Sequence, residues 1–301
     1  MCGIVGYLGK DTVVPIILDG LQALEYRGYD SSGVALFKNN DGHQDIEVYK
    51  SAGKLACLRD RLPEALFEKN GKSLHVAMGH TRWATHGAPT DTNAHPHISH
   101  DQTIAIIHNG IIENYGQLRE ELKAKGVDFK SNTDTECVAH LIEDIAKTEP
   151  DFLKVLQKTA KRLVGTYALV IMNKALPNKL YGIRHQAPLC IGVGADELFI
   201  ASDFTAVANR TSKVAYMHES EVVELSESGY KVTDFDGNAV TLKEELLSSG
   251  NLIVDKRGFK HFMLKEIYEQ PDVVRNAISG RLLHHEDPVT DRKSTRLNSS
   301  H

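Results

Sequence analysis

Cysteine is scarce in this sequence, tryptophan occurs once, and no hydrophobic run is long. The 4 cysteines among the 301 residues are widely spaced and form no Cys-x-x-Cys pair, so we expect free thiols in a reducing compartment. Apolar runs such as Val13–Leu18 fall far short of the roughly 20 residues that cross a bilayer. The start lacks the basic and apolar segments of a signal peptide, and a cytoplasmic location is therefore expected.

Charge of one sign is also modest. The formal net charge is −5, so no basic field favours nucleic acid as a partner. The chain is 41% apolar and 25% charged, which is ordinary for a globular protein. Its length indicates one large domain or two modest ones, either with a real core.

Strand and helix patterns are distributed unevenly along the chain. Strand-like runs gather near the start and again after residue 166, whereas helical spacing gathers between residues 115 and 163. This distribution predicts an α+β protein with layered sheets and helices outside them. The expected early strands are Ile4–Leu8, Ser32–Phe37, Ile46–Lys50, His75–Thr81 and Thr103–His108, and the expected helices are Val13–Leu24, Tyr115–Lys125, Asp134–Lys147 and Phe152–Leu163.

Cysteine at position 2 is the first candidate for chemistry. Removal of Met1 would leave Cys2 with a free α-amine and a thiol, whose ordinary pKa values are about 8 and about 8.5. One residue would then hold both a nucleophile and its own base. The alternative is that a cysteine in second position has no role.

The run from Thr81 to Gly87 reads as a strand entering a loop, and it contains two candidates. The planar guanidinium of Arg82 suits a carboxylate, although a surface ion pair is the simpler interpretation. Trp83 either belongs to a site or packs in the core, which is the commoner place for a tryptophan.

The pair Asn109-Gly110 follows an alternating strand, and two interpretations compete. Asn-Gly in this position is typical of a tight turn. The asparagine amide and the neighbouring glycine N–H would also form a good site for an oxyanion, because the missing Cβ permits close approach.

Asp134 stands where a helix is expected to begin. Its carboxylate would favour the first turn of that helix, where negative charge is stabilising. Alternatively it would hold a substrate ammonium, and Arg82 with Asp134 would clamp the two charged groups of a free amino acid.

Together with Leu24–Ser31 and His261–Pro271, these motifs resemble the class II glutamine amidotransferases, in order from residue 2 to about residue 283. The resemblance implies a four-layer αββα sandwich of the N-terminal-nucleophile type that cleaves the γ-amide of L-glutamine, with no metal or other cofactor. By motif it assigns Cys2 as the nucleophile, Asn109 and Gly110 as the oxyanion site, Arg82 and Asp134 as the partners of the glutamine α-carboxylate and α-ammonium, Trp83, Thr85 and His86 as members of the same pocket, and Arg27 as a supporting residue.

Within this class the motifs are most similar to the branch that delivers ammonia to fructose 6-phosphate. Amidophosphoribosyltransferases, the alternative branch, usually carry a Gln-His-Arg-Gly-Gln-like version of residues 25–29. The resemblance implies a homodimeric full-length enzyme, with neither nucleic acid nor membrane as a partner. The expected organisation is a glutaminase domain at 2–240, a linker at 241–260, the entry to a sugar-isomerase half at 261–290, and an end at 291–301 that looks like a translated sequencing adapter, so that the natural chain would continue beyond residue 290.

Two other hypotheses stay open. Histidine is the commonest metal ligand, and a group of histidines between residues 75 and 108 favours a metal-dependent amidohydrolase, although no His-Glu-x-x-His motif accompanies it. A non-catalytic glutamine-binding module is the other hypothesis, and retention of Met1 would favour it. The histidines of the first hypothesis are His75, His80, His86, His95, His97, His100 and His108.

Overall fold

The computed structural model describes residues 2–40, 43–68, 75–84, 87–247 and 262–278. The chain divides into two compact units, Met1–Ile253 and Val254–His301. The predicted end at 291–301 lies outside the described residues, as does most of the predicted linker at 241–260. The roles expected for the segments of the chain therefore stay predictions.

The first unit contains two antiparallel sheets. The larger has eight strands in the order β15-β11-β9-β10-β1-β4-β2-β3, which places β1 between β10 and β4. The N-terminal strand is thus held from both sides by main-chain hydrogen bonds. The strands of this sheet are β1 (Gly3–Gly9), β2 (Ser31–Asn40), β3 (His43–Ala52), β4 (His75–Arg82), β9 (Cys190–Val193), β10 (Leu198–Ala201), β11 (Lys213–Tyr216) and β15 (Glu244–Leu246).

The second sheet has seven strands in the order β14-β13-β12-β8-β7-β6-β5. Its centre is formed by β8, β7 and β6. Most residues of these three strands are buried. The strands are β5 (His97–Ile98), β6 (Ile104–Ile112), β7 (Gly165–Asn173), β8 (Leu180–His185), β12 (Glu221–Ser226), β13 (Gly229–Asp234) and β14 (Ala239–Val240).

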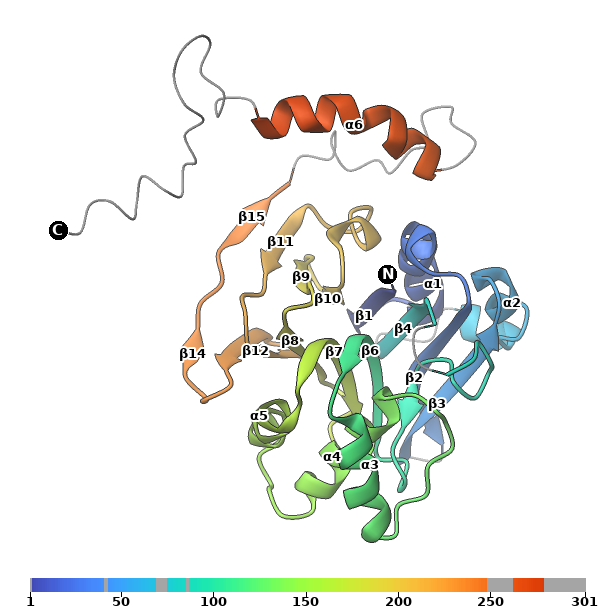
Figure 1. Ribbon diagram of the computed structural model, residues 1–301, viewed down its shortest axis with the longest axis vertical. Coiled ribbons are helices and arrows are strands. Elements are labelled where there is room, and N and C mark those ends of the chain that lie inside the picture. The colour runs from blue at the N-terminus through green and yellow to red at the C-terminus, as the bar shows by residue number, and fades with distance from the viewer. Residues whose placement is uncertain (1, 41–42, 69–74, 85–86, 248–261, 279–301) are drawn as a thin grey trace, which may run out of the picture. The chain divides into compact units, whose positions relative to one another are not determined.

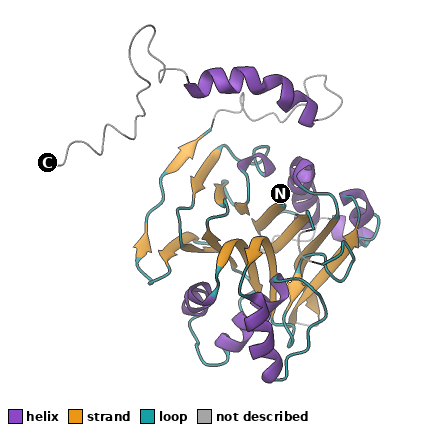
Figure 2. Ribbon diagram, in the orientation of Figure 1, coloured by secondary structure: helices purple, strands orange, loops and turns teal. Residues whose placement is uncertain are grey.

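The helices of the first unit lie on the outer faces of the sheets (Figures 1 and 2). Their apolar residues recur at helical spacing, so each helix has one face to bury against a sheet. They are α1 (Val13–Leu24), α2 (Leu55–Arg59), α3 (Tyr115–Ala124), α4 (Thr135–Ala146) and α5 (Phe152–Arg162), with short 3-10 turns at Glu25–Arg27, Glu64–Phe67 and Phe204–Ala206.

Three hydrophobic clusters correspond to the three interfaces of four layers. One joins the two sheets and includes Met78 of β4 and Ile107 of β6. A second joins the larger sheet to α1, and a third joins the smaller sheet to α3, α4 and α5. Because side chains alternate across a strand, each sheet contributes to the central cluster and to one outer cluster. The predicted αββα sandwich is confirmed.

The turn predicted as the simpler interpretation of Asn109-Gly110 is wrong. Strand β6 continues through both residues to Ile112, and Asn109 and Gly110 pair with Ala168 and Tyr167 of β7. Gly110 has φ +130°, and a Cβ there would meet the carbonyl oxygen of Thr166 at 1.9 Å. Only glycine fits this position, so its requirement comes from close strand packing and not from a hairpin.

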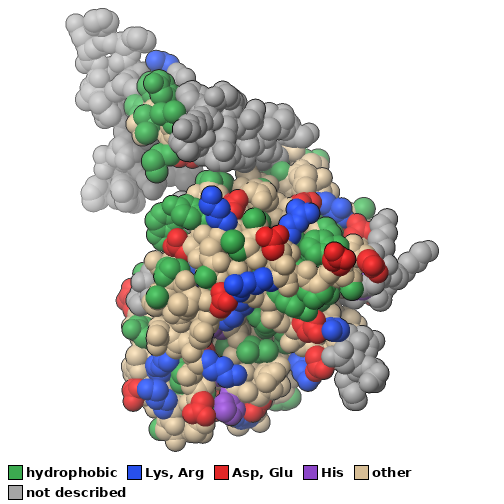
Figure 3. Space-filling model, turned by 90° about the vertical axis from the view of Figure 1, so that its right-hand side faces the viewer, with side chains coloured by type: hydrophobic (Ala, Val, Ile, Leu, Met, Phe, Trp, Pro, Cys, Tyr) green, Lys and Arg blue, Asp and Glu red, His purple; other side chains and the backbone are tan. Residues whose placement is uncertain are grey.

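Other features of the described residues refine the expectations. The helix expected at 13–24 begins and ends as predicted, but the side chain of its N-cap residue, Thr12, makes no capping hydrogen bond. Helix α6 (Phe262–Ile278) belongs to the second unit and exposes Met263, Ile267 and Tyr268. No helix within the described part of the chain is long and apolar enough to span a membrane. Figure 3 shows Lys and Arg interspersed with Asp and Glu on one face.

Candidate active site

Cys2 lies immediately before β1, at the end of that strand where it meets β4. Gly3 pairs with Thr81, which brings Cys2 beside the loop that leaves β4. The Trp83 N–H donates to the Cys2 Sγ at 3.2 Å, and the thiol faces the Trp83 carbonyl oxygen at 3.6 Å. The sulfur is therefore held by main-chain atoms of one residue.

Burial raises the pKa of the Cys2 thiol, while the Trp83 N–H and the Arg82 charge lower it less. A raised pKa keeps the sulfur protonated near neutral pH. Within the described part of the chain, the hydrogen-bond partners found for Sγ are main-chain atoms of Trp83, and neither is a base. Any attack by this sulfur therefore needs a proton acceptor other than a hydrogen-bonded side chain.

Asn109 reaches Cys2 from the other sheet. Its side-chain Nδ2 donates to the Cys2 carbonyl oxygen at 3.0 Å, and its Oδ1 lies 2.9 Å from Nε2 of His80. Gly110 follows Asn109 on β6 and is exposed. An amide nitrogen carries two hydrogens, so Nδ2 keeps a second donor after it has bound the Cys2 carbonyl.

Arg82 ends β4 and is 4% exposed. Burial lowers the pKa of its guanidinium, whereas Cys2, Asp134 and Asp30 raise it, in that order. Two carboxylates, those of Asp134 and Asp30, are therefore near enough to act on the Arg82 guanidinium. The main chain of Arg82 lies directly against Gly28. A Cβ at position 28 would be 2.9 Å from the Arg82 carbonyl carbon, so glycine permits this contact.

Asp134 is buried at the start of α4, but its carboxylate makes no capping bond to that helix. It accepts the Ile112 N–H at 2.8 Å and lies 4.0 Å from Nδ1 of His108. The carboxylate is thus turned toward the end of β6, where Asn109 and Gly110 stand. Its position at a helix N-terminus is still favourable for negative charge.

Trp83 does not pack in the core, so that interpretation is wrong. Its side chain is 46% exposed, and its ring meets the edge of Tyr29 with centroids 5.8 Å apart. Thr85 and His86 lie outside the described residues. Arg27 forms an ion pair with Asp203, at a cavity of about 280 Å³. The supporting role expected for Arg27 stays a prediction.

Four of the seven histidines gather in the interior, between the sheets and α4. Ring centroids of His95 lie 4.4 Å from His80, 4.9 Å from His97 and 6.4 Å from His108. Burial lowers the pKa of His80 to about 3 and lowers those of His95 and His97 well below the ordinary value. In the described ranges no group of three or more His, Cys, Asp or Glu side chains is arranged to hold a metal ion.

Pattern reading did not find three contacts of this region. Asp30 accepts the Ala84 N–H at 3.0 Å and so fixes the loop after β4. Tyr29 contacts Trp83, and His80 contacts Asn109. Each pair joins segments far apart in sequence. The available signal was that Tyr29 and Asp30 stand inside the quoted Leu24–Ser31 motif and that His80 directly precedes the run that begins at Thr81.

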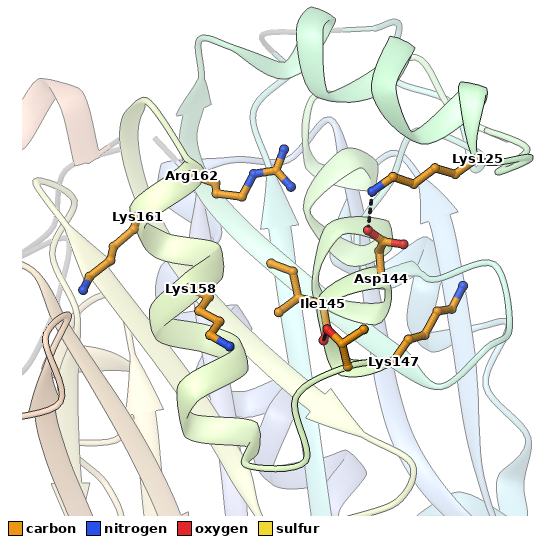
Figure 4. Close-up of a pocket in the computed structure, with 8 residues that line it drawn as sticks. Lys125, Asp144, Ile145, Lys147, Lys158, Lys161 and Arg162 are labelled. Atoms are coloured by element: carbon orange, nitrogen blue, oxygen red, sulfur yellow. Dashed lines mark hydrogen bonds and ion pairs between the residues drawn. The ribbon is translucent and has the colours of Figure 1, made fainter.

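A basic cavity of about 700 Å³ lies elsewhere and shares no residue with the group around Cys2. Lys158, Lys161 and Arg162 come from α5, and Lys125 and Asp144 lie across from them, joined at 2.7 Å (Figure 4). Most of its cations already have acidic partners, because Lys158 pairs with Glu149, Lys161 with Asp236 and Arg162 with Glu121. This cavity is a solvated surface of compensated charge.

Comparison with known proteins shows which families and relatives this chain is similar to. The family model described as a glutamine amidotransferase domain matches residues 80–209. A glutamine–fructose-6-phosphate aminotransferase (isomerizing) from Aquifex aeolicus is 46% identical over 94% of this chain and 46% of its own length. Its counterpart from Bacteroides thetaiotaomicron is 44% identical over 94% of this chain and 45% of its own. The chain spans about half the length of these curated relatives.

Solved structures agree on the fold. A glutamine phosphoribosylpyrophosphate amidotransferase from B. subtilis matches with a TM-score of 0.63 and 26% identity, over 79% of this chain and 50% of its own. A structure described as the allosteric regulatory enzyme of purine biosynthesis matches with a TM-score of 0.65 and 26% identity, over 78% of this chain and 49% of its own.

The two facing sheets have the fold of the N-terminal-nucleophile amidotransferases, and residues 80–209 match the glutamine amidotransferase domain. Within that class its sequence is similar to the glutamine–fructose-6-phosphate aminotransferases along nearly all of its length.

Proposed function

We propose that this chain hydrolyses L-glutamine to L-glutamate and ammonia, with Cys2 as the nucleophile. The observation that carries the proposal is the meeting of Cys2 with Asn109, whose amide donates to the Cys2 carbonyl at 3.0 Å. The second hydrogen of that amide would serve as a donor to a carbonyl oxygen that develops negative charge when Sγ attacks. Gly110, the next residue, is the proposed second contributor.

The proton chemistry follows from the state of the sulfur. Because the pKa of the Cys2 thiol is raised, Sγ must lose its proton as it attacks the γ-carbonyl carbon. The proposed acceptor is the Cys2 α-amine, freed by removal of Met1 and acting through a water molecule. The protonated α-amine of Cys2 then returns the proton to the leaving nitrogen of glutamine as the C–N bond breaks, and ammonia departs. Water then attacks the γ-glutamyl thioester, releasing glutamate and restoring the thiol.

Recognition of free glutamine is proposed for two buried charged residues, Arg82 and Asp134, which lie close enough to influence each other. Arg82 would bind the α-carboxylate, since a guanidinium can donate two parallel hydrogen bonds to it. Asp134 would accept the α-ammonium with the oxygen capacity left after its bond to the Ile112 N–H. Trp83, half-exposed on the loop after β4, would cover the bound glutamine together with Thr85 and His86.

For the whole protein we propose that the ammonia converts fructose 6-phosphate to an amino-sugar phosphate in a cytoplasmic homodimer. The names of the curated relatives and the identity of 46% over 94% of the chain support this proposal. Transfer to phosphoribosyl pyrophosphate has less support, because the matching glutamine phosphoribosylpyrophosphate amidotransferase is only 26% identical.

The glutaminase proposal is tested by comparing two cysteine variants of the same chain. Cys2→Ala should abolish glutamate release and the mass increase of a trapped γ-glutamyl adduct. Cys57→Ala is the matched control, since this cysteine is exposed on α2 and should leave turnover unchanged. Undiminished turnover of Cys2→Ala would contradict the proposal.

The role of the α-amine has a separate test. Material with Met1 retained is compared with material that begins at Cys2, each checked by N-terminal mass analysis. Loss of turnover in the Met1-retaining chain is expected, because its nitrogen is then an amide without basicity. Equal turnover in the two preparations would exclude the amine as the base.

A further inference from the structure

The orientation of the Asn109 amide matters, because its two ends have opposite chemistry. With Nδ2 toward Cys2, a donor faces the developing oxyanion. Rotation of the amide by half a turn would bring Oδ1 there instead. Oδ1 and the Cys2 carbonyl oxygen, which are both acceptors, would then face the oxyanion with no donor between them. The Cys2 carbonyl favours this orientation from one end of the amide, and a donor at Oδ1 would hold the other end.

We propose that His80 is the positioning residue that sets the Asn109 amide for oxyanion binding, an inference that rests on the function proposed above. His80 Nε2 lies 2.9 Å from Asn109 Oδ1. A backbone carbonyl can only accept, so Nδ2 must face Cys2 and Oδ1 must face His80. Oδ1 can only accept as well, and the proton of His80 therefore sits on Nε2.

The two partners meet because of strand alternation. Met78 and His80 project from the same face of β4, and Ile107 and Asn109 project from the same face of β6. Met78 and Ile107 belong to the cluster between the sheets, so His80 and Asn109 face each other across the same interface. The hydrogen bond between them closes the end of the central core.

His80 is suited to this task because its surroundings leave it neutral and fixed. It is fully buried, and burial lowers its pKa to about 3, so one tautomer of the uncharged ring serves throughout the neutral range. The His95 ring contacts it in a tilted arrangement, with centroids 4.4 Å apart. His97, which contacts His95, has its Nε2 3.0 Å from Thr133 Oγ1. The hydrogen bonds continue from Thr133 through the Ser131 hydroxyl to the Glu136 carboxylate.

The test begins with single variants of His80 in the full chain. His80→Phe keeps a buried ring but removes the N–H, and kcat for glutamine hydrolysis should fall about 100-fold, with KM changed less than about threefold. His80→Gln places an amide N–H near the position of Nε2 and should retain kcat within about tenfold. His100→Gln, which alters an exposed side chain, is the matched control.

Coupling to Asn109 separates positioning from a general structural role. The double variant Asn109→Ala with His80→Phe should lose no more kcat than Asn109→Ala alone, because His80 then has nothing to orient. Fully additive losses, or a His80→Gln variant as impaired as His80→Phe, would overturn the inference. A loss in Asn109→Ala with none in His80→Phe overturns it too, and leaves the glutaminase proposal standing.

A measurement on the unaltered protein keeps the inference open to refutation if His80→Phe does not fold. Nitrogen NMR of histidine-labelled chain reports the tautomer of each ring. We expect a protonated Nε2 and a bare Nδ1 for His80 between pH 6 and 8. A proton on Nδ1 instead would leave Oδ1 of Asn109 without its donor and would overturn the assignment.

Discussion

The two ends of β4 and β6 differ in composition although the same strands run through both. Toward one end the faces between the sheets carry Met78 and Ile107, which are fully buried in the central hydrophobic cluster. Two residues further along, the same faces carry His80 and Asn109, which are joined by a hydrogen bond. The apolar end and the polar end are thus one continuous interface.

This difference shows how one interface can hold both a stable core and the proposed site. Apolar burial at the first end stabilises the sandwich at about 25 cal/mol for each Å² removed from water. At the polar end, buried groups add less to stability and must each find a partner. Histidines that remain neutral supply such partners without the cost of a buried charge. Stability and chemistry therefore lie on separate segments of the same strands.

The largest effect is expected from Arg82→Lys at the polar end. An ammonium cannot reproduce the two parallel hydrogen bonds of the guanidinium, so KM for glutamine should rise about 100-fold, which corresponds to about 3 kcal/mol. Steady-state kinetics measures this change. Arg61→Lys, in an exposed pair with Asp91, is the control, and equal KM values for the two variants would remove Arg82 from the proposed binding site.

At the apolar end, Ile107→Ala should lower the free energy of unfolding by about 3 kcal/mol. The reason is the cavity left between the sheets, where Ile107 is 0% exposed. Denaturant titration measures the loss. Ile111→Ala on the same strand, where the side chain is 39% exposed, should cost well under half as much. Similar losses at the two positions would mean that Ile111 contributes as much to the hydrophobic core as Ile107.

Acid should weaken the polar end specifically. The pKa of His80 is about 3 in the folded chain against an ordinary 6.5, so between these values the unfolded chain binds a proton that the folded chain does not. Stability is therefore full above about pH 7 and falls as the pH drops, by about 2 kcal/mol for this one group at pH 5. Unfolding midpoints at pH 7.5 and pH 5 measure this difference.

Substitution identifies the source of that pH dependence. His80→Gln should remove the share that belongs to His80, while His95 and His97 still contribute because their pKa values are also lowered. His100→Gln should leave the pH dependence unchanged, since the side chain is exposed. If the stability of His80→Gln depended on pH as strongly as that of the unaltered chain, His80 would take up a proton equally in the folded and the unfolded state.

The smallest effect is expected far from both ends, in the basic cavity of Figure 4. Lys125→Met breaks the pair with Asp144 on an exposed surface, where such pairs contribute little. The free energy of unfolding should change by less than about 0.5 kcal/mol, and glutamine turnover should stay the same. A clear loss of turnover would mean that this cavity, and not the region of Cys2, takes part in the reaction.

Much of the fold could be predicted, because it depends on local periodicity. The helices at 13–24, 115–124, 135–146 and 152–162 lie within a residue or two of expectation. The Asn109-Gly110 turn failed because local turn preference competes with the close packing of β6 against β7 at Thr166. That packing joins residues distant in sequence, and the pattern of one strand carries no information on it.

The candidate site was predictable as a set of residues but not as an arrangement. Motifs brought Cys2, Arg82, Asn109 and Asp134 together, and the structure gathers all four. The partner of Asn109 could not be deduced, because His80 stands on the other sheet and its register is set by the stacking of the layers. The histidines suggested metal ligands, whereas the rings lie face to face or edge to face, with hydroxyl and amide partners.

The position of Trp83 gives the molecule a built-in optical reporter. It is the single indole of the sequence, its ring is partly open to solvent, and its own main chain contacts the sulfur of Cys2, the proposed nucleophile. Emission excited in the indole band therefore comes from one place in the chain. Titration with a slowly reacting glutamine analogue can follow occupancy of that place by a shift in emission wavelength, with no added dye and no engineered residue.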